Sequence, residues 1–172
     1  MASERLMNRR KFLCVSGGVA AAMAAGTSGW LFGQGSANSS EFEITKSAEE
    51  WRKVLSDEQF GVLRLEKTER PFTSALLNEK RKGNFHCAGC DLPLYPSDTK
   101  YESGTGWPSF YAPLPDAVAT KTDYKIIVPR TEVHCRRCGG HLGHVFNDGP
   151  PPTGKRHCIN GVALIFHPTS GT

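Results

Sequence analysis

Two Cys-x-x-Cys pairs constrain the fold of this chain more than any other feature of its sequence. They run from Cys87 to Cys90 and from Cys135 to Cys138. Two intervening residues allow both sulfurs of a pair to face one point, and four thiolates around one point favour tetrahedral zinc. Residues 91–134 separate the pairs, so a whole subdomain must lie between them. Four ligands fill the metal's shell, which predicts one structural Zn²⁺ per chain.

Two other uses of these cysteines compete with zinc. The pairs could form disulfides or act as redox-active dithiols. Export to an oxidising compartment would favour disulfides. Folding and metal binding before export would protect the thiolates instead, so zinc is the prediction.

The first 37 residues differ from the rest in charge and composition. The chain has 172 residues, which fits one domain with an appendage. Of its 21 Lys and Arg and 17 Asp and Glu, residues 1–37 hold four basic groups and one acid, which leaves 17 basic and 16 acidic residues in 38–172. This nearly neutral body argues against nucleic acid as a partner, because binding it requires a basic face.

The leader, residues 1–37, resembles a twin-arginine export signal. Arg9 and Arg10 precede a weakly hydrophobic stretch rich in Gly and Ala, from Phe12 to Phe32. The resemblance implies the twin-arginine export machinery as a partner and the bacterial periplasm as location, with the thylakoid lumen as an alternative. A weak membrane anchor is the competing interpretation. The small residues before Ala37 suit cleavage there. Cys14 lies in the leader and is assigned no chemical role.

The body, residues 38–172, is predicted to be mainly β (α+β), with short helices on the N-terminal side. Ser47 and Ser56 are expected to cap two helices. Their apolar faces would consist of Trp51, Val54 and Leu55 in the first and Phe60, Val62 and Leu63 in the second.

The rest of the body has the pattern of strands and turns. Gly and Pro recur every few residues from Phe85 onward. A turn is predicted at residues 70–72 and a charged loop at 78–84. Strands are predicted in the apolar runs Lys125–Val128, Thr131–His134 and Ile159–Phe166. The helices would pack on an antiparallel β domain.

Cys158 is the one body cysteine outside the two pairs. Residues alternate between the faces of a strand, so Arg156 is expected on the same face as Cys158 and His157 on the opposite one. The positive charge of Arg156 would lower the pKa of the thiol and favour the reactive thiolate. A buried, inert structural cysteine is the alternative.

Two further clusters favour a reactive role for Cys158. His141 and His144 directly follow the second Cys pair, and acid–base use suits them better than metal binding because the cysteines already complete a zinc shell. Satisfied structural histidines are the alternative. Trp107 lies in a Gly- and Pro-rich loop, where its ring could form the wall of a small apolar pocket or simply a hydrophobic plug.

Taken together, these motifs closely resemble the B-type methionine-R-sulfoxide reductase family. The resemblance covers about residues 42–168, and as a set its motifs are very specific. The matching pieces are Glu50-Trp51, Thr68-Glu69-Arg70-Pro71-Phe72, both Cys pairs, Lys100-Tyr101, Gly106-Trp107-Pro108-Ser109-Phe110, His141-Leu142-Gly143-His144-Val145-Phe146, Asp148-Gly149-Pro150, and Thr153-Gly154 with Arg156, Cys158 and Asn160.

The resemblance implies two small antiparallel sheets and reduction of the R epimer of methionine sulfoxide, free or in oxidised proteins. Cys158 would be the nucleophile and become a sulfenic acid. His144 would be the acid near the sulfoxide oxygen. His141 and Asn160 would be further catalytic residues, which help to orient the substrate and to protonate or polarise that oxygen. Trp107 would contact the substrate's methyl group. The supporting candidates are Asp148 and Arg156. The zinc ligands would be Cys87, Cys90, Cys135 and Cys138.

Thr105 departs from the family pattern. Many members have a resolving cysteine at this position, which forms a disulfide with the oxidised nucleophile. With threonine here, no free body cysteine remains to resolve the sulfenic acid of Cys158. We therefore expect an external thiol, a thioredoxin-like protein or a small molecule, to regenerate a monomeric enzyme.

Two other functions are compatible with parts of the sequence. Arg136 and Arg137 in the second Cys pair would suit phosphates in an exported zinc-ribbon-like binding module without catalytic activity. The neutral body argues against it. A zinc hydrolase using His141 and His144 lacks the glutamate of a His-Glu-x-x-His motif.

Overall fold

The computed structural model describes residues 42–169. The leader, Cys14 and the cleavage position after Ala37 lie outside these residues. Among residues 42–169, no helix is long and apolar enough to cross a membrane.

Two short helices form the N-terminal part of the described chain. They are α1 (Ala48–Val54) and α2 (Asp57–Leu65). Ser47 and Ser56 each close a capping box, in which the serine hydroxyl accepts from the third helical N–H and that residue's side chain accepts from the cap's N–H. Both predicted helices are confirmed. Val54 is the exception on their apolar faces, since it is 59% exposed while Trp51 and Leu55 are buried.

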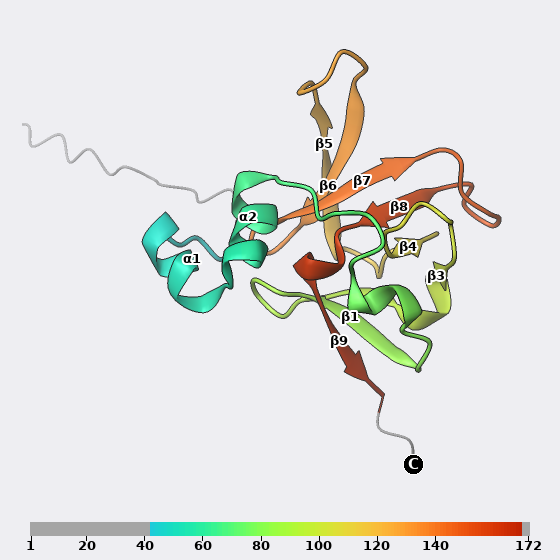
Figure 1. Ribbon diagram of the computed structural model, residues 1–172, viewed down its shortest axis with the longest axis horizontal. Coiled ribbons are helices and arrows are strands. Elements are labelled where there is room, and N and C mark those ends of the chain that lie inside the picture. Colours follow the sequence, from blue (N-terminus) through green and yellow to red (C-terminus); the bar gives the residue numbers. More distant parts are fainter. Residues whose placement is uncertain (1–41, 170–172) are drawn as a thin grey trace, which may run out of the picture. The chain divides into compact units, whose positions relative to one another are not determined.

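The strands form two antiparallel sheets, as Figure 1 shows. One sheet has three strands in the order β2-β1-β9, and the other has six in the order β3-β4-β8-β7-β6-β5. The predicted class, mainly β with two small sheets and short helices, is therefore confirmed. The strands are β1 (Gly83–Cys87), β2 (Pro93–Pro96), β3 (Lys100–Tyr101), β4 (Ser109–Phe110), β5 (Val118–Asp123), β6 (Arg130–Cys135), β7 (His141–Phe146), β8 (Arg156–Ile159) and β9 (Leu164–Pro168).

The core lies between the sheets and beneath the helices. Phe85 of β1, Phe110 of β4 and the adjacent Tyr95 are fully buried, with ring centroids 4.4–5.0 Å apart in successive pairs. The hydroxyl of Tyr95 lies 3.1 Å from Nδ1 of His157. Burial lowers the pKa of His157 to about 4, which keeps this imidazole neutral at pH 7. His157 is therefore a core residue, on the opposite side of β8 from Cys158.

Three strand and loop boundaries differ from the sequence prediction. Lys125–Val128 is the exposed connection between β5 and β6, because the Asp123 carboxylate accepts from Lys125 N and ends the strand. Ile127 is fully exposed there. The run Ile159–Phe166 is divided by a 3₁₀ turn, Gly161–Ala163, between β8 and β9. The predicted loop 78–84 ends early, since β1 begins at Gly83.

Candidate active site and metal centre

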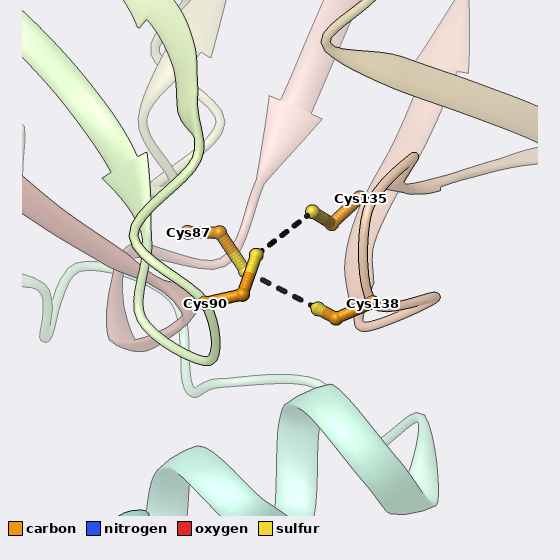
Figure 2. Close-up of side chains that lie close together, drawn as sticks. All are labelled: Cys87, Cys90, Cys135 and Cys138. Carbon is orange, nitrogen blue, oxygen red and sulfur yellow. Dashed lines mark hydrogen bonds between the residues drawn. The ribbon is translucent and has the colours of Figure 1, made fainter. Parts of the chain in front are cut away.

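The four paired cysteines converge at one point, as Figure 2 shows. Cys87 and Cys90 flank the turn after β1, and Cys135 and Cys138 flank the turn after β6. The Sγ atoms of Cys87 and Cys138 are 3.7 Å apart and those of Cys90 and Cys135 are 3.5 Å apart.

These sulfur positions fit a tetrahedral metal. Zn–S bonds of ~2.3 Å place sulfurs about 3.8 Å apart, whereas a disulfide requires about 2.05 Å. The cysteines are free thiols, which excludes the disulfide alternative in this structure. Hydrogen bonding to Cys135 and burial raise the pKa of Cys87. The four sulfurs could therefore hold a metal such as zinc.

Cys158 and His144 are direct partners on adjacent strands. Cys158 is on β8 and His144 on β7, and the antiparallel register pairs them. Directly opposite side chains on one face have Cβ atoms about 4.5–5.5 Å apart. Gly143 permits this approach, because a Cβ there would meet the Cys158 carbonyl oxygen at 2.1 Å. The sheet thus brings a thiol and an imidazole together.

A bulge in β7 turns His141 to the same face as His144. Val133 pairs with Gly143 and His134 with His141, so Leu142 is an extra residue on β7. The two imidazole centroids are consequently 5.5 Å apart, although the residues are three apart in a strand. The carbonyl of Leu142 accepts from both the backbone N and Nδ2 of Asn160.

A cavity of about 120 Å³ opens over this strand pair. It brings together four of the predicted site residues, Cys158, His144, Trp107 and Asn160. His141, Asp148 and Arg156 do not line it. The complete lining is Thr68, Trp107, Arg130, Gly143, His144, Phe146, Cys158 and Asn160.

Burial affects the pKa of the Cys158 thiol more than the charge of Arg156 does. Desolvation raises the pKa of Cys158, while a hydrogen bond with Thr105 and the charge of Arg156 oppose this only in part. Arg156 is on the same face of β8, as predicted, but its guanidinium pairs with both oxygens of Asp148 at 2.8–2.9 Å. The expected net lowering of the Cys158 pKa is therefore wrong for the free protein.

Two buried carboxylates lie next to the two histidines, and neither was predicted from the sequence. Asp123 Oδ2 accepts from Nε2 of His144 at 2.8 Å. Glu132 Oε1 lies 3.0 Å from Nδ1 of His141, with both side chains almost fully buried. Burial lowers the pKa of His144, and the bond to Asp123 opposes that shift. Hydrogen bonds from Lys125 N, His144 and Arg130 lower the pKa of Asp123, so it is ionised.

Glu69 fixes two walls of the cavity from outside it. Its carbonyl accepts from Nε1 of Trp107 at 2.9 Å, and its N–H donates to Oδ1 of Asn160 at 2.9 Å. Both ends of the Asn160 amide are thus engaged with backbone groups. Gly106 precedes Trp107 at φ +92, and a Cβ there would meet Pro71 at 2.8 Å, so glycine is required. Glu69 belongs to the Thr68–Phe72 motif noted in the sequence, but no role was predicted for it.

Thr105 is next to the cavity thiol. Its Oγ1 is 3.9 Å from Sγ of Cys158 and 2.9 Å from Oγ of Ser103. Among the described residues, the remaining cysteines all belong to the four-sulfur cluster.

Known proteins are similar in sequence to this chain over most of its described residues. Residues 55–168 match the SelR domain. A protein named peptide methionine sulfoxide reductase MsrB from Pseudomonas putida (strain W619) is 56% identical over 130 residues, which cover 75% of this chain and 98% of that protein. A protein of the same name from Leptospira interrogans is 54% identical over 126 residues, which cover 73% of this chain and 96% of that protein. Another from Methanosarcina barkeri is 57% identical over 124 residues, which cover 72% of this chain and 87% of that protein.

Proposed function

Because the chain belongs to the SelR family of MsrB-type peptide methionine sulfoxide reductases, we propose that it reduces the R epimer of methionine sulfoxide, free or in oxidised proteins. The observation that carries this proposal is the cross-strand pair of Cys158 and His144 in a cavity that Trp107 also lines. In the reduction of a methyl sulfoxide, a thiol can act as the nucleophile and an imidazole as the acid, and an aromatic wall can contact the methyl group.

The proposed reaction transfers oxygen from the substrate to Cys158. Sγ bonds to the sulfoxide sulfur and the oxygen gains a proton. The protonated oxygen then moves to Sγ, as its bond to the substrate sulfur and the new bond between the two sulfurs both break. The products are methionine, whose sulfur gains two electrons, and the sulfenic acid of Cys158, which loses two. The raised pKa of Cys158 and the lowered pKa of His144 make both groups neutral at rest. His144 therefore carries the thiol proton to the sulfoxide oxygen.

The remaining site residues set the orientation of the substrate. The Trp107 ring, held at Glu69, would contact the S-methyl group and so decide which epimer turns its oxygen toward His144. His141 lies behind His144 and Asn160 is bonded to backbone, so both act as positioning residues. The Arg156–Asp148 pair moderates the charge near Cys158.

The direct test is turnover of the separated epimers. We expect methionine from the R epimer and none above background from the S epimer, with dithiothreitol or a thioredoxin as donor. Product formation from free and peptide-bound substrate should be followed by chromatography. Equal rates on both epimers would refute the proposed arrangement of Trp107 and His144.

Replacement of the carboxylate behind His144 should slow reduction. In Asp123→Asn, the imidazole loses a charged acceptor that raises its pKa, so it takes up the Cys158 proton, which the departing oxygen must receive, less readily. General acid catalysis contributes roughly 10²–10⁴-fold, and we expect kcat to fall by about 10- to 100-fold with little change in KM. The pH dependence of kcat should move to lower pH. Asp98 is exposed in the connection between β2 and β3, so Asp98→Asn is the matched control. This variant should change neither kcat nor its pH dependence.

We also propose a cycle with one cysteine, in which an external thiol reduces the sulfenic acid. Thr105 occupies the place from which a second thiol could reach Cys158, as the 3.9 Å separation indicates. After one turnover without donor, the enzyme should carry one sulfenic acid and no internal disulfide.

The variant Thr105→Cys should change that outcome. A thiol at this position is close enough to form a disulfide with Cys158, so single turnover should yield a protein lighter by two hydrogens than its reduced form. Intact mass spectrometry with and without a sulfenic acid trap distinguishes the products. An internal disulfide of Cys158 in the unaltered protein would overturn the one-cysteine cycle.

For the four-sulfur cluster we propose zinc, and for the leader a role in export. Zinc would be held by all four thiolates with no open position, so its contribution is to folding and not to the reaction. Residues 1–37 would direct the folded, metal-loaded enzyme through the twin-arginine machinery to the periplasm. Retention of a leader fusion in the cytoplasm when both Arg9 and Arg10 are changed to Lys is the expected result.

A further inference from the structure

A second group of metal-ligating side chains lies beside the first Cys pair. It consists of His86, the residue before Cys87, of Asp91, the residue after Cys90, and of His167 on β9. Within residues 42–169, this group and the four cysteines are the two sets of at least three such side chains whose ligand atoms lie within 4.8 Å of one another. The proposed reaction uses none of these three residues.

Both imidazoles aim a nitrogen at the same carboxylate oxygen. Nδ1 of His86 is 3.1 Å and Nε2 of His167 is 3.0 Å from Oδ1 of Asp91. A metal ion with Zn–N and Zn–O bonds of ~2.0–2.2 Å holds neighbouring ligand atoms about 3.0–3.4 Å apart. The two nitrogen–oxygen separations already match that spacing. The carbonyl oxygen of Asp91, 3.0 Å from the same nitrogen of His86, is a further atom that could ligate the metal.

The backbone holds the three side chains in this arrangement. In the β1–β9 ladder, His86 pairs with Ile165 and Asn84 with His167, so the histidines are diagonal neighbours on one face. Their rings stack with centroids 4.2 Å apart. The N–H of Asp91 donates to the Cys87 carbonyl at 2.8 Å and closes the turn of the first Cys pair. Little rearrangement is needed for all three to reach one ion.

We propose that His86, Asp91 and His167 form a second metal site, which binds Zn²⁺ or a similar divalent transition metal ion. Two imidazoles with one carboxylate select such ions over Mg²⁺ and Ca²⁺, which prefer oxygen ligands. The Asp91 and His167 side chains are 64% and 48% exposed, so the ion exchanges with solvent and keeps water in its open positions. Bound metal would tie β9 to the turn that carries Cys87 and Cys90.

Calorimetric titration of Zn²⁺ into the full chain with its four-cysteine site already loaded tests this site. A Cys158→Ser background removes the cavity thiol as a competing ligand. We expect one further equivalent of zinc to bind with a micromolar Kd. His167→Asn and Asp91→Asn should each weaken this step at least about tenfold. Asp98→Asn should leave it unchanged. His167 is remote in sequence from the cysteines, so its variant should keep the first zinc.

Cobalt provides the second measurement. Co²⁺ added to the zinc-loaded chain should give weak visible bands typical of nitrogen and oxygen ligands, without thiolate-to-metal absorption, and His167→Asn should abolish them. The proposal is overturned if no second equivalent binds, if the three variants bind it alike, or if the cobalt spectrum shows thiolate ligation.

Discussion

The Cys158→Ser variant should lose sulfoxide reduction almost completely. A serine hydroxyl at neutral pH is a poor nucleophile toward sulfur and cannot take up the oxygen as a sulfenic acid, so we expect kcat/KM to fall by at least about 10⁴-fold. The zinc content should stay at one equivalent, because Cys158 is outside the four-sulfur cluster. Methionine release from the R epimer and metal analysis of the same preparation measure both.

The folding of this variant separates chemistry from structure. Cys158 is half-buried at the cavity, and serine is nearly isosteric, so the free energy of unfolding should change by no more than about 1 kcal/mol. Asp98→Asn again serves as a control that should retain full activity. Residual turnover above one-hundredth of the wild-type rate would place the nucleophile elsewhere, and loss of zinc together with activity would make Cys158 a structural residue.

The spacing of residues within short segments was enough to predict the helices and the four-sulfur cluster. Each capping box spans four residues, and each Cys pair also spans four residues. Alternation along a strand likewise placed Arg156 and His157 on opposite sides of β8. These features depend on local geometry, which the sequence carries directly.

Features that depend on pairing between strands escaped prediction. Glu132 would ordinarily face solvent, since it alternates with the buried Val133, yet β6 is buried on both faces and Glu132 meets His141. Asp123 becomes a partner of His144 only through the register of β5, β6 and β7. Nothing in the neighbouring residues signals either contact.

The pKa of Cys158 illustrates the same limit. The charge of Arg156 nearby in sequence predicted an acidic thiol, but the structure adds two effects that sequence proximity does not reveal. The carboxylate of Asp148, eight residues before Arg156, pairs with the guanidinium and offsets its charge. The walls of the cavity desolvate the sulfur. Because a neutral thiol is less easily oxidised, this environment would protect Cys158 until a substrate enters the cavity.

Removal of the metal from the four-cysteine site should unfold the body. The site joins the turn after β1 in the three-stranded sheet to the turn after β6 in the six-stranded sheet, so it links both halves of the core. Structural zinc contributes apparent free energies of about 10–16 kcal/mol in small domains, comparable with the whole stability of a protein, about 5–15 kcal/mol. Cys138→Ser should therefore abolish zinc binding at the four-cysteine site and leave no cooperative unfolding transition at 25 °C.

Chelation of the unaltered chain should produce the same state without a mutation. Near-ultraviolet circular dichroism and reductase activity should disappear together on prolonged treatment with a strong chelator, and should return on addition of Zn²⁺ under reducing conditions. His167→Asn should behave as the unaltered chain does, because it removes a ligand of the proposed second site only. A metal-free protein that kept its near-ultraviolet signal and its melting temperature would show that the packing of the two sheets suffices, and that the four sulfurs contribute little to the fold.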